Sequence, residues 1–492
     1  MNPILVAAVL GLYFLLLFVI SAYTSRKATN ATFYQANRSA HWLLVAFGMV
    51  GTSLSGVTFI SVPGTVSTSG FYYFQVVIGY FLGYFAVAFV LLPLYYRLQL
   101  VSIYSYLLNR FGMNTYRSGA GLFVISRTLG ATLRLYLVIN VLQLFVLNAL
   151  GVPFAITALV ILLMILAYTF KGGVKTIVWT DTLQTFFMLL ALVVCVIFIL
   201  NNLNITFFQA IERLSESGQM RIFNFFDIND KRFFLKQILG GAFITISMTG
   251  LDQEMMQKNI SVTNLRDSQK NMISFSAVMT LVNFLFLFLG GLLCIYAAEN
   301  ALTLQGDDLF PTIVMQHLPP LIGLIFIIGL ISALFPSADG AITALTASFC
   351  IDILRLEENT HKTAEQRVAI RKKVHLTFAA VFLLMVLYFK WLDNKEIVNT
   401  LLEIAGYTYG PLLGMFAFGI LTKRGVSDGK APVVCVVAPV LVWLIDKNSV
   451  EFLGGYKFGF EILLINGLLT FLGFWIISRP QSNSSSIQMP TS

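Results

Sequence analysis

The chain has 492 residues, of which 57% are hydrophobic and only 11% charged, and its formal net charge at pH 7 is +9. A soluble domain carries about 25% charged residues, so this chain cannot cover a globular surface with polar groups and is predicted to be an all-α polytopic membrane protein. Its positive charges lie in short segments between apolar stretches rather than on one basic face, which argues against nucleic-acid binding.

Thirteen apolar runs along the chain predict thirteen membrane-spanning helices. Their approximate ranges are 3–23, 42–64, 71–96, 119–148, 151–169, 175–201, 237–256, 271–298, 319–353, 374–392, 396–422, 430–446 and 459–478. No positive segment precedes the first run, and Arg26 and Lys27 follow it. This order is typical of a retained span and not of a signal peptide.

The distribution of Lys and Arg predicts the orientation, because cytoplasmic loops are enriched in positive charge. With thirteen spans and the N-terminus outside, 21 of the 32 Lys and Arg residues fall in segments on the inside, Lys258 among them. We therefore expect a multi-pass protein of the plasma (inner) membrane, with its N-terminus outside and its C-terminus in the cytoplasm.

Two spans are interrupted by small polar residues. The span 42–64 contains "FGMVGTSLSGVTFISVPG", and the span 237–256 contains "LGGAFITISMTGLDQ". Each occupies the first position of a set of five spans, which makes residues 41–201 and 237–424 candidates for two repeats. Interrupted spans at matching positions are typical of inverted-repeat transporters that bind their ligands at mid-membrane. Packing of small residues between helices is the alternative.

The remaining segments flank these repeats. Residues 1–40 are expected to hold one extra span and a cytoplasmic loop, and residues 202–236 an outer connection whose "TFFQAIERLSE" predicts a short amphipathic helix. Residues 425–480 predict two C-terminal spans, and residues 481–492 a polar, disordered cytoplasmic tail.

Ionisable residues inside predicted spans are costly, and they often mark functional sites. The chain has eight: Arg127, Arg134, Asp181, Asp252, Glu254, Asp339, Asp352 and Glu403. Those near span ends are expected to cap helices or reach the interface. Arg134, Asp181 and Asp339 are the strongest candidates for function, although a structural pairing of Arg134 with an acid stays open.

Four stretches together resemble the sodium:solute symporter family. They are "SIYSYLLNRFG" at 102–112, "GGVKTIVWTDTLQTFFM" at 172–188, "LDQEMMQKNI" at 251–260 and "LEIAGYTYGPLLGMFAFGILTKR" at 402–424. The resemblance implies a LeuT-like 5+5 inverted repeat with one extra N-terminal and two extra C-terminal helices. It also implies sodium-driven import of a small organic solute by alternating access, with Na⁺ as the coupling ion and no organic cofactor.

The resemblance implies a sodium site formed by Gly51 and Leu54 of the broken first core helix and Ala333 and Ser337 of the eighth. The family has two adjacent hydroxyl residues where this chain has Pro336 and Ser337. One hydroxyl ligand is therefore missing. Since proline has no N–H, a released carbonyl or a water is expected to replace it.

Some family members have a second sodium site, which uses the aspartate of the "WTD" motif and two further hydroxyls. The aspartate matches Asp181, but the hydroxyl positions here are Asp339 and Gly340. Two facing carboxylates can share a proton or hold a cation between them. We therefore expect an ion or a proton to be handled near Asp181 and Asp339.

The substrate residues resemble most those of the bacterial branch that transports sialic acid and related organic acids. Arg134 matches an arginine that binds the substrate carboxylate, and Ser55 and Thr58 match substrate-binding hydroxyls. A glutamine of that branch corresponds to Val77, so the solute need not be sialic acid itself. A guanidinium binds carboxylates through two parallel hydrogen bonds.

Two other functions remain open: a membrane sensor that works with a separate signalling partner, and a symporter for a neutral solute such as a sugar. An enzyme is disfavoured because the sequence has no HExxH or GxSxG motif and we assign no catalytic residues. The four Cys and four His are scattered, so Na⁺ is the only metal expected. Lipid, sodium and a small solute are the expected partners, with no obligate protein partner.

Overall fold

The computed structural model describes residues 3–24, 41–100, 102–356, 358, 361–392 and 397–480. This part of the chain is helical except for loops and one two-residue strand pair, which confirms the predicted helical membrane-protein architecture. Eight of its helices are long and apolar enough to cross a membrane, or nine if one bent pair counts as a single span.

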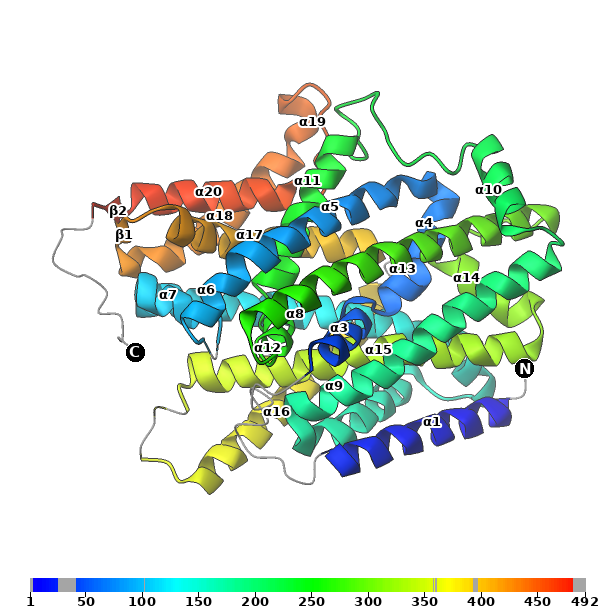
Figure 1. Ribbon diagram of the computed structural model, residues 1–492, viewed down its shortest axis with the longest axis horizontal. Coiled ribbons are helices and arrows are strands. Elements are labelled where there is room, and N and C mark those ends of the chain that lie inside the picture. The colour runs from blue at the N-terminus through cyan, green and yellow to red at the C-terminus, as the bar shows by residue number, and fades with distance from the viewer. Residues whose placement is uncertain are drawn as a thin grey trace.

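The helices take up most of the described sequence (Figure 1). In chain order they are α1 (Pro3–Thr24), α3 (Trp42–Ser53), α4 (Gly56–Ser69), α5 (Tyr73–Ala86), α6 (Leu92–Arg97), α7 (Ser105–Arg110), α8 (Met113–Leu142), α9 (Phe154–Asn202), α10 (Phe207–Glu216), α11 (Phe234–Thr245), α12 (Gln253–Asn259), α13 (Leu265–Glu299), α14 (Leu309–Thr312), α15 (Pro320–Ser348), α16 (Ala364–Leu392), α17 (Ile397–Leu421), α18 (Ala431–Lys447), α19 (Ser449–Phe452) and α20 (Ile462–Ile476).

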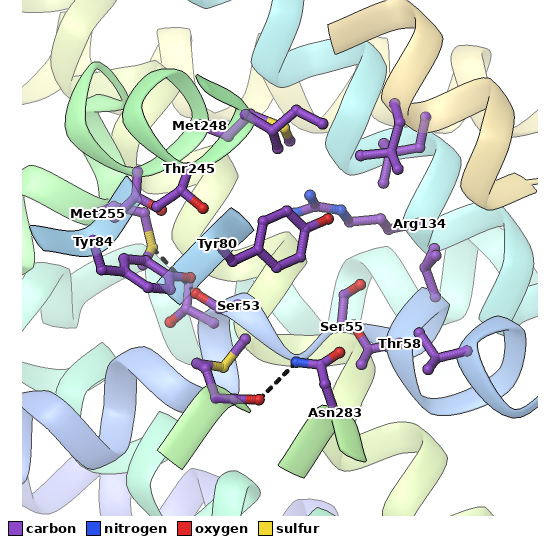
Figure 2. Close-up of a pocket in the computed structure, with 18 of the residues that line it drawn as sticks. Ser53, Ser55, Thr58, Tyr80, Tyr84, Arg134, Thr245, Met248, Met255 and Asn283 are labelled. Atoms are coloured by element: carbon purple, nitrogen blue, oxygen red, sulfur yellow. Dashed lines mark hydrogen bonds between the residues drawn. The ribbon is translucent and has the colours of Figure 1, made fainter. Parts of the chain in front are cut away.

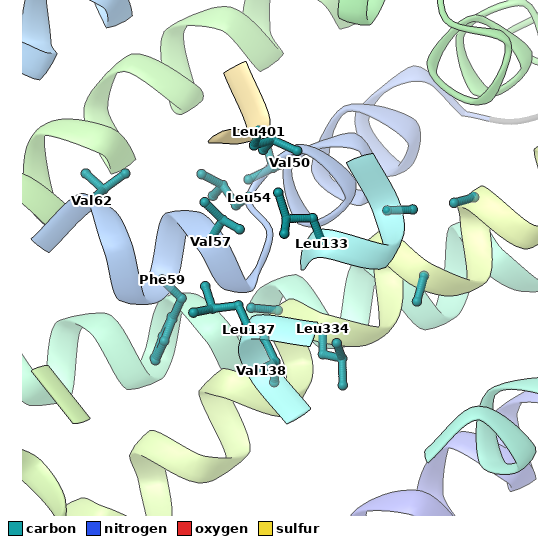
Figure 3. Packing of buried hydrophobic residues seen from close by; sticks show 14 of the residues in the cluster. Val50, Leu54, Val57, Phe59, Val62, Leu133, Leu137, Val138, Leu334 and Leu401 are labelled. Atoms are coloured by element: carbon teal, nitrogen blue, oxygen red, sulfur yellow. The ribbon is translucent and has the colours of Figure 1, made fainter. Parts of the chain in front are cut away.

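The first interrupted span is broken, as its sequence predicts. Helix α3 ends at Ser53 and α4 begins at Gly56, with Leu54 and Ser55 in extended conformations between them. Small and β-branched residues surround this break, and Gly and Ser weaken a helix by exposing or competing for its backbone hydrogen bonds. Figure 3 shows Leu54 packed close to Leu133 of α8, which buries the break in the protein interior.

The second interrupted span is also broken. Helix α11 continues into a π-helical turn (Ile246–Gly250), and α12 then leaves at an angle of 69°. Asp252 caps α12, since its carboxylate accepts hydrogen bonds from the backbone N–H groups of Glu254 and Met255. The predicted capping role of Asp252 is therefore confirmed. The bend directs α12 into the protein, where it contacts α3, α9 and α15.

Lys258 is buried in the protein. The charge count predicts that it belongs to a cytoplasmic segment, and its side chain is only 3% exposed at the end of the inward-directed α12. The sequence gives the break at Leu251 and Asp252 but not the direction in which the following helix continues.

Close backbone approach joins the two halves of the fold. Helices α5 and α11 pack along each other, and a Cβ on Gly79 would lie 2.2 Å from the carbonyl oxygen of Ile238. Small residues allow such contacts between helices in lipid, where apolar surface alone gives no reason to associate.

The connections lie at two ends of the helical bundle. In Figure 1, α7, β1 (Gly425–Val426) and β2 (Ser478–Arg479) lie at one end, whereas α10 and α14 lie at the other. Strands β1 and β2 pair antiparallel, so the chain enters α18 and leaves α20 at the same end. The predicted amphipathic helix of the outer connection is α10, which begins with a capping box formed by Thr206 and Gln209.

Candidate functional site

A pocket lies beside the break between α3 and α4 and has a cavity volume of about 110 Å³. One water molecule needs a cavity volume of about 10–15 Å³. The pocket therefore has room for several waters or a small organic molecule. Figure 2 shows polar side chains from several helices around it. Its polar lining residues are Thr52, Ser53, Ser55, Thr58, Tyr73, Tyr80, Tyr84, Arg127, Arg134, Thr245, Thr249 and Asn283.

The three predicted substrate residues share this pocket. Ser55 lies in the break itself, Thr58 follows one turn into α4, and Arg134 extends from α8 toward Tyr80 (Figure 2). Ser55 is buried and Arg134 is 9% exposed. Two hydroxyls and one guanidinium, from segments far apart in the sequence, therefore line one cavity.

Arg134 and its neighbour Arg127 differ in their partners. Arg127 forms buried ion pairs with Glu254 and, at 3.8 Å between Nη1 and Oδ2, with Asp252. Arg134 has no carboxylate within 4 Å among the described residues, and its Nε–H has no hydrogen-bond acceptor there. The structural pairing expected as an alternative for Arg134 belongs to Arg127. Arg134 presents a buried positive charge to the pocket.

The pocket also contains groups that the sequence did not single out. The hydroxyls of Tyr73 and Tyr80 lie 3.3 Å apart, and the side-chain amide of Asn283 donates to the carbonyl of Met279 at 2.8 Å. Tyr73 and Tyr80 interact electrostatically with Arg134. The only sequence signal for them was the presence of tyrosines in a predicted span, which is equally typical of simple helix packing.

The four predicted sodium residues lie on elements that contact each other. Gly51 and Leu54 belong to the end of α3, Ala333 and Ser337 belong to α15, and all four are buried. The Ser337 hydroxyl donates its proton to the carbonyl of Leu334 at 2.8 Å. The lone pairs of that hydroxyl oxygen remain available to a cation.

Helix α15 continues through Pro336. Beside it, the hydroxyl of Ser332 is hydrogen-bonded to the Tyr13 hydroxyl of α1 at 2.7 Å. The proline therefore removes one backbone donor without breaking the helix.

Asp181 lies on α9 beside the sodium residues and is fully buried. Its Oδ2 accepts hydrogen bonds from the Lys258 ammonium at 2.6 Å and from the Thr52 hydroxyl at 3.0 Å. Its Oδ1 has no hydrogen-bond partner among the described residues. Lys258 thus forms an ion pair with the predicted ion-site aspartate, an interaction that the sequence analysis missed.

Glu254 joins the two buried cations of the site. Its Oε2 is bound by Arg127, and its Oε1 lies 3.6 Å from Lys258 Nζ, one helical turn away on α12. Asp252 completes this network, because it accepts a hydrogen bond of 2.8 Å from the Tyr409 hydroxyl of α17. The Glu–x₃–Lys spacing in "QEMMQK" was the available sequence signal for the Glu254–Lys258 pair.

Asp339 lies on α15 near the same network. It is fully buried, and its Oδ1 accepts a hydrogen bond from the Gly340 backbone. The structure therefore pairs Lys258 with Asp181 and places Asp339 on the helix α15, which packs against α9 and α12. Within the described ranges, no group of three or more His, Cys, Asp and Glu side chains is arranged to hold a metal ion.

Comparisons with known proteins point to one family. The model of the sodium:solute symporter family matches residues 33–431. The sodium/sialic acid symporter NanT of Aliivibrio fischeri is 23% identical, with 92% of this chain and 90% of that protein covered. The sodium/sialic acid symporter SiaT of Proteus mirabilis is 22% identical, with 88% of each chain covered. Mouse sodium-coupled monocarboxylate transporter 1 is 24% identical, with 90% and 71% covered.

Solved structures show a similar fold. A substrate-bound, outward-open Na⁺-coupled sialic acid symporter matches with a TM-score of 0.83 at 19% identity, over 97% of this chain and 99% of that chain. Mhp1, a nucleobase-cation-symport-1 family transporter, matches with a TM-score of 0.54 at 14% identity, over 90% of this chain and 94% of that one.

Proposed function

The chain belongs to the sodium:solute symporter family, and from this premise we propose that it imports a small solute that carries a carboxylate. It is a sodium-coupled transporter and not an enzyme. The observation that carries the substrate class is Arg134, a buried guanidinium that faces the pocket without an acidic partner among the described residues.

A buried charge without a partner is unfavourable, so a protein keeps one only where a ligand compensates it. A carboxylate is the natural complement of guanidinium, because two parallel hydrogen bonds fit its planar geometry. Ser55, Thr58, Tyr80 and Asn283 provide further donors and acceptors for the hydroxyl and amide groups of a polar solute. A neutral sugar would leave the Arg134 charge uncompensated.

The names of the relatives support the same substrate class. NanT and SiaT are named as sodium/sialic acid symporters, and the mouse relative as a monocarboxylate transporter. Sialic acids and monocarboxylates share a carboxylate and differ in the rest of the molecule. Sialic acid is therefore the first solute to test, with smaller organic acids next.

We propose that the coupling sodium ion binds between the broken α3–α4 helix and α15. Its ligands are the carbonyls of Gly51, Leu54 and Ala333 and the hydroxyl of Ser337. A second positive charge, whether a mobile ion, a proton or a cation of the protein itself, is handled at Asp181 and Asp339, and the Lys258 ammonium is paired with the first of these acids.

The proposed topology has thirteen spans in a 5+5 inverted repeat, with the N-terminus outside. Helix α1 and strand β2 place the two ends of the described chain at opposite ends of the bundle in Figure 1, as an odd number of spans requires. The broken helices α3–α4 and α11–α12 are the matching first elements of the two repeats. Sodium that favours the outward-open state tightens solute binding, and the solute tightens sodium binding by the same factor.

A thermal-shift panel on the purified full-length protein tests the substrate class. Carboxylates, including N-acetylneuraminate and short monocarboxylates, are expected to raise the unfolding midpoint with sodium present and less with choline in its place, because ligands stabilise the state that they bind. The uncharged methyl esters are the matched controls and should give no shift. Equal shifts from acids and esters, or a response to neutral sugars alone, would reject the carboxylate assignment.

A further inference from the structure

The Lys258 ammonium lies inside the region proposed to handle a second cation. Its side chain is 3% exposed, and α12, which carries it, contacts α3, α9 and α15. Those three helices also carry Gly51, Asp181 and Ser337. A permanent positive charge of the protein therefore lies next to the residues proposed to bind mobile cations.

Three oxygens lie around the ammonium. Nζ donates hydrogen bonds to Asp181 Oδ2 at 2.6 Å and to the Thr52 hydroxyl, and it lies 3.6 Å from Glu254 Oε1, an ion-pair distance without a hydrogen bond. An ammonium has three donors and no acceptor, and two of the three donate to these oxygens. Two of the three oxygens belong to carboxylates, which also supply the charge that a buried monovalent cation requires.

The unusual sequence of α15 fits the same arrangement. A Cβ at position 340 would lie 2.1 Å from Glu254 Oε1, so the missing side chain of Gly340 makes the space in which the Glu254 carboxylate lies beside Lys258. Asp339, one residue earlier on the same helix, is a further fully buried carboxylate. The residues that replace the family's hydroxyls here thus accommodate a bound ammonium.

We propose that Lys258 is a built-in cation that occupies the second ion site, so that the transporter binds a single sodium ion. The proposal rests on the proposed sodium-coupled function and specifies its stoichiometry. The Lys258 ammonium neutralises the Asp181 carboxylate in place of a free ion. It cannot dissociate, because it is part of the chain. Sodium then binds only at the site formed by Gly51, Leu54, Ala333 and Ser337.

A purely structural ion pair is the competing explanation, and it makes a different prediction. If Lys258 only stabilises the contact between α12 and α9, its removal lowers the stability of the fold and leaves the number of bound sodium ions unchanged. If Lys258 occupies an ion site, its removal exposes Asp181, whose Oδ1 already lacks a partner in the described part of the chain, to a second sodium ion.

The test counts sodium ions on the purified full-length protein without any solute. The thermal unfolding midpoint is followed against sodium concentration at constant ionic strength, with choline as the replacement ion. At sodium concentrations well above the dissociation constant, the slope against the logarithm of sodium concentration, converted to free energy with the calorimetric enthalpy of unfolding, gives the number of ions bound. The variants are Lys258→Met, Asp181→Asn and the double variant. Lys236→Met is the matched control, because Lys236 is also buried but binds the carbonyl of Lys457 away from the ion site.

Wild type, Asp181→Asn, Lys236→Met and the double variant are expected to show a slope of one ion, and Lys258→Met a slope near two. A slope of two in the wild type, a slope that Asp181→Asn lowers, or a slope of one in a folded Lys258→Met would overturn the proposal. Should Lys258→Met not fold, a slope of two in the wild type, or a slope that Asp181→Asn lowers, would still overturn the proposal. The complete absence of a sodium effect in the wild type would instead reject the sodium-coupled function itself.

Discussion

At the scale of single residues, two arginines on the same helix have opposite roles. Arg127 and Arg134 are both buried and both line the pocket, yet Arg127 is held by Glu254 and Asp252 while Arg134 has no ion pair among the described residues. Sequence position could not separate them, since each is one basic residue in an apolar span. The acidic partners of Arg127 come from α12 and its N-cap, more than a hundred residues away in the chain.

Arg134→Met is expected to raise the KM for a carboxylate solute about 10- to 100-fold, because hydrogen bonds to a charged group contribute about 1.5–3 kcal/mol. Transport assays with the acid and with its methyl ester separate charge recognition from general damage. The variant should bind acid and ester equally weakly, and its sodium-dependent thermal shift should persist. An unchanged preference for the acid would show that Arg134 does not contact the carboxylate.

Ser337→Ala is expected to weaken sodium activation of transport by several-fold, since the hydroxyl oxygen is lost as a cation ligand. Ser332→Ala is the control. It lies on the same helix and also loses a buried hydroxyl, but that hydroxyl is hydrogen-bonded to Tyr13. The sodium concentration that gives half-maximal uptake is measured for both variants. Equal shifts in the two variants would place the sodium ion elsewhere.

At the scale of elements, the two broken helices position the residues of the solute pocket and of the proposed ion sites. The break at Leu54 and Ser55 opens the pocket, and the bend before α12 brings Glu254 and Lys258 inward. Both breaks were predictable from glycine and hydroxyl residues in otherwise apolar runs. The direction of α12 was not, because it depends on where Asp181, Arg127 and Tyr409 lie in the folded protein.

Gly340→Ala tests the contact between α15 and α12. The added methyl group would lie against the Glu254 carboxylate, which Arg127 and Lys258 hold in place, so we expect a loss of about 1–3 kcal/mol and a lower unfolding midpoint. Gly121→Ala is the control, because nothing lies within 4 Å of its Cβ position in α8. That substitution should be neutral or slightly stabilising. Equal midpoints for the two variants would mean that Glu254 does not pack on Gly340.

At the scale of the whole molecule, the segments predicted from their charges to lie on one side of the membrane are also found together in the structure. The regions predicted to be cytoplasmic, such as α7 and β1, gather at one end of the bundle, and helix α10, which is predicted to lie outside, is at the other end (Figure 1). Hydrophobic run length and loop charge were sufficient to predict this arrangement. They could not give the ion network, which depends on side-chain contacts between distant spans.

Cysteine labelling tests the proposed orientation. In a variant without the four native cysteines, Ser215→Cys in α10 should react with an impermeant maleimide added to intact cells. Lys430→Cys, before α18, should react only after the membrane is opened. Both positions are exposed. The reverse pattern would invert the topology, and labelling of both positions from outside would contradict the odd number of spans predicted between Ser215 and Lys430.

Uptake into proteoliposomes tests the central claim most directly. The purified protein, reconstituted with an inward sodium gradient and a negative interior, is expected to accumulate radiolabelled N-acetylneuraminate or another organic acid above equilibrium. One sodium ion that moves together with one carboxylate carries no net charge, so the sodium gradient supplies the driving force; each net positive charge moved inward would add roughly 2.3 kcal/mol per 100 mV of negative interior potential. Accumulation should stop when choline replaces sodium and should be lost in Arg134→Met. Sodium-independent uptake, or no uptake of any carboxylate while a neutral solute is accumulated, would contradict the account.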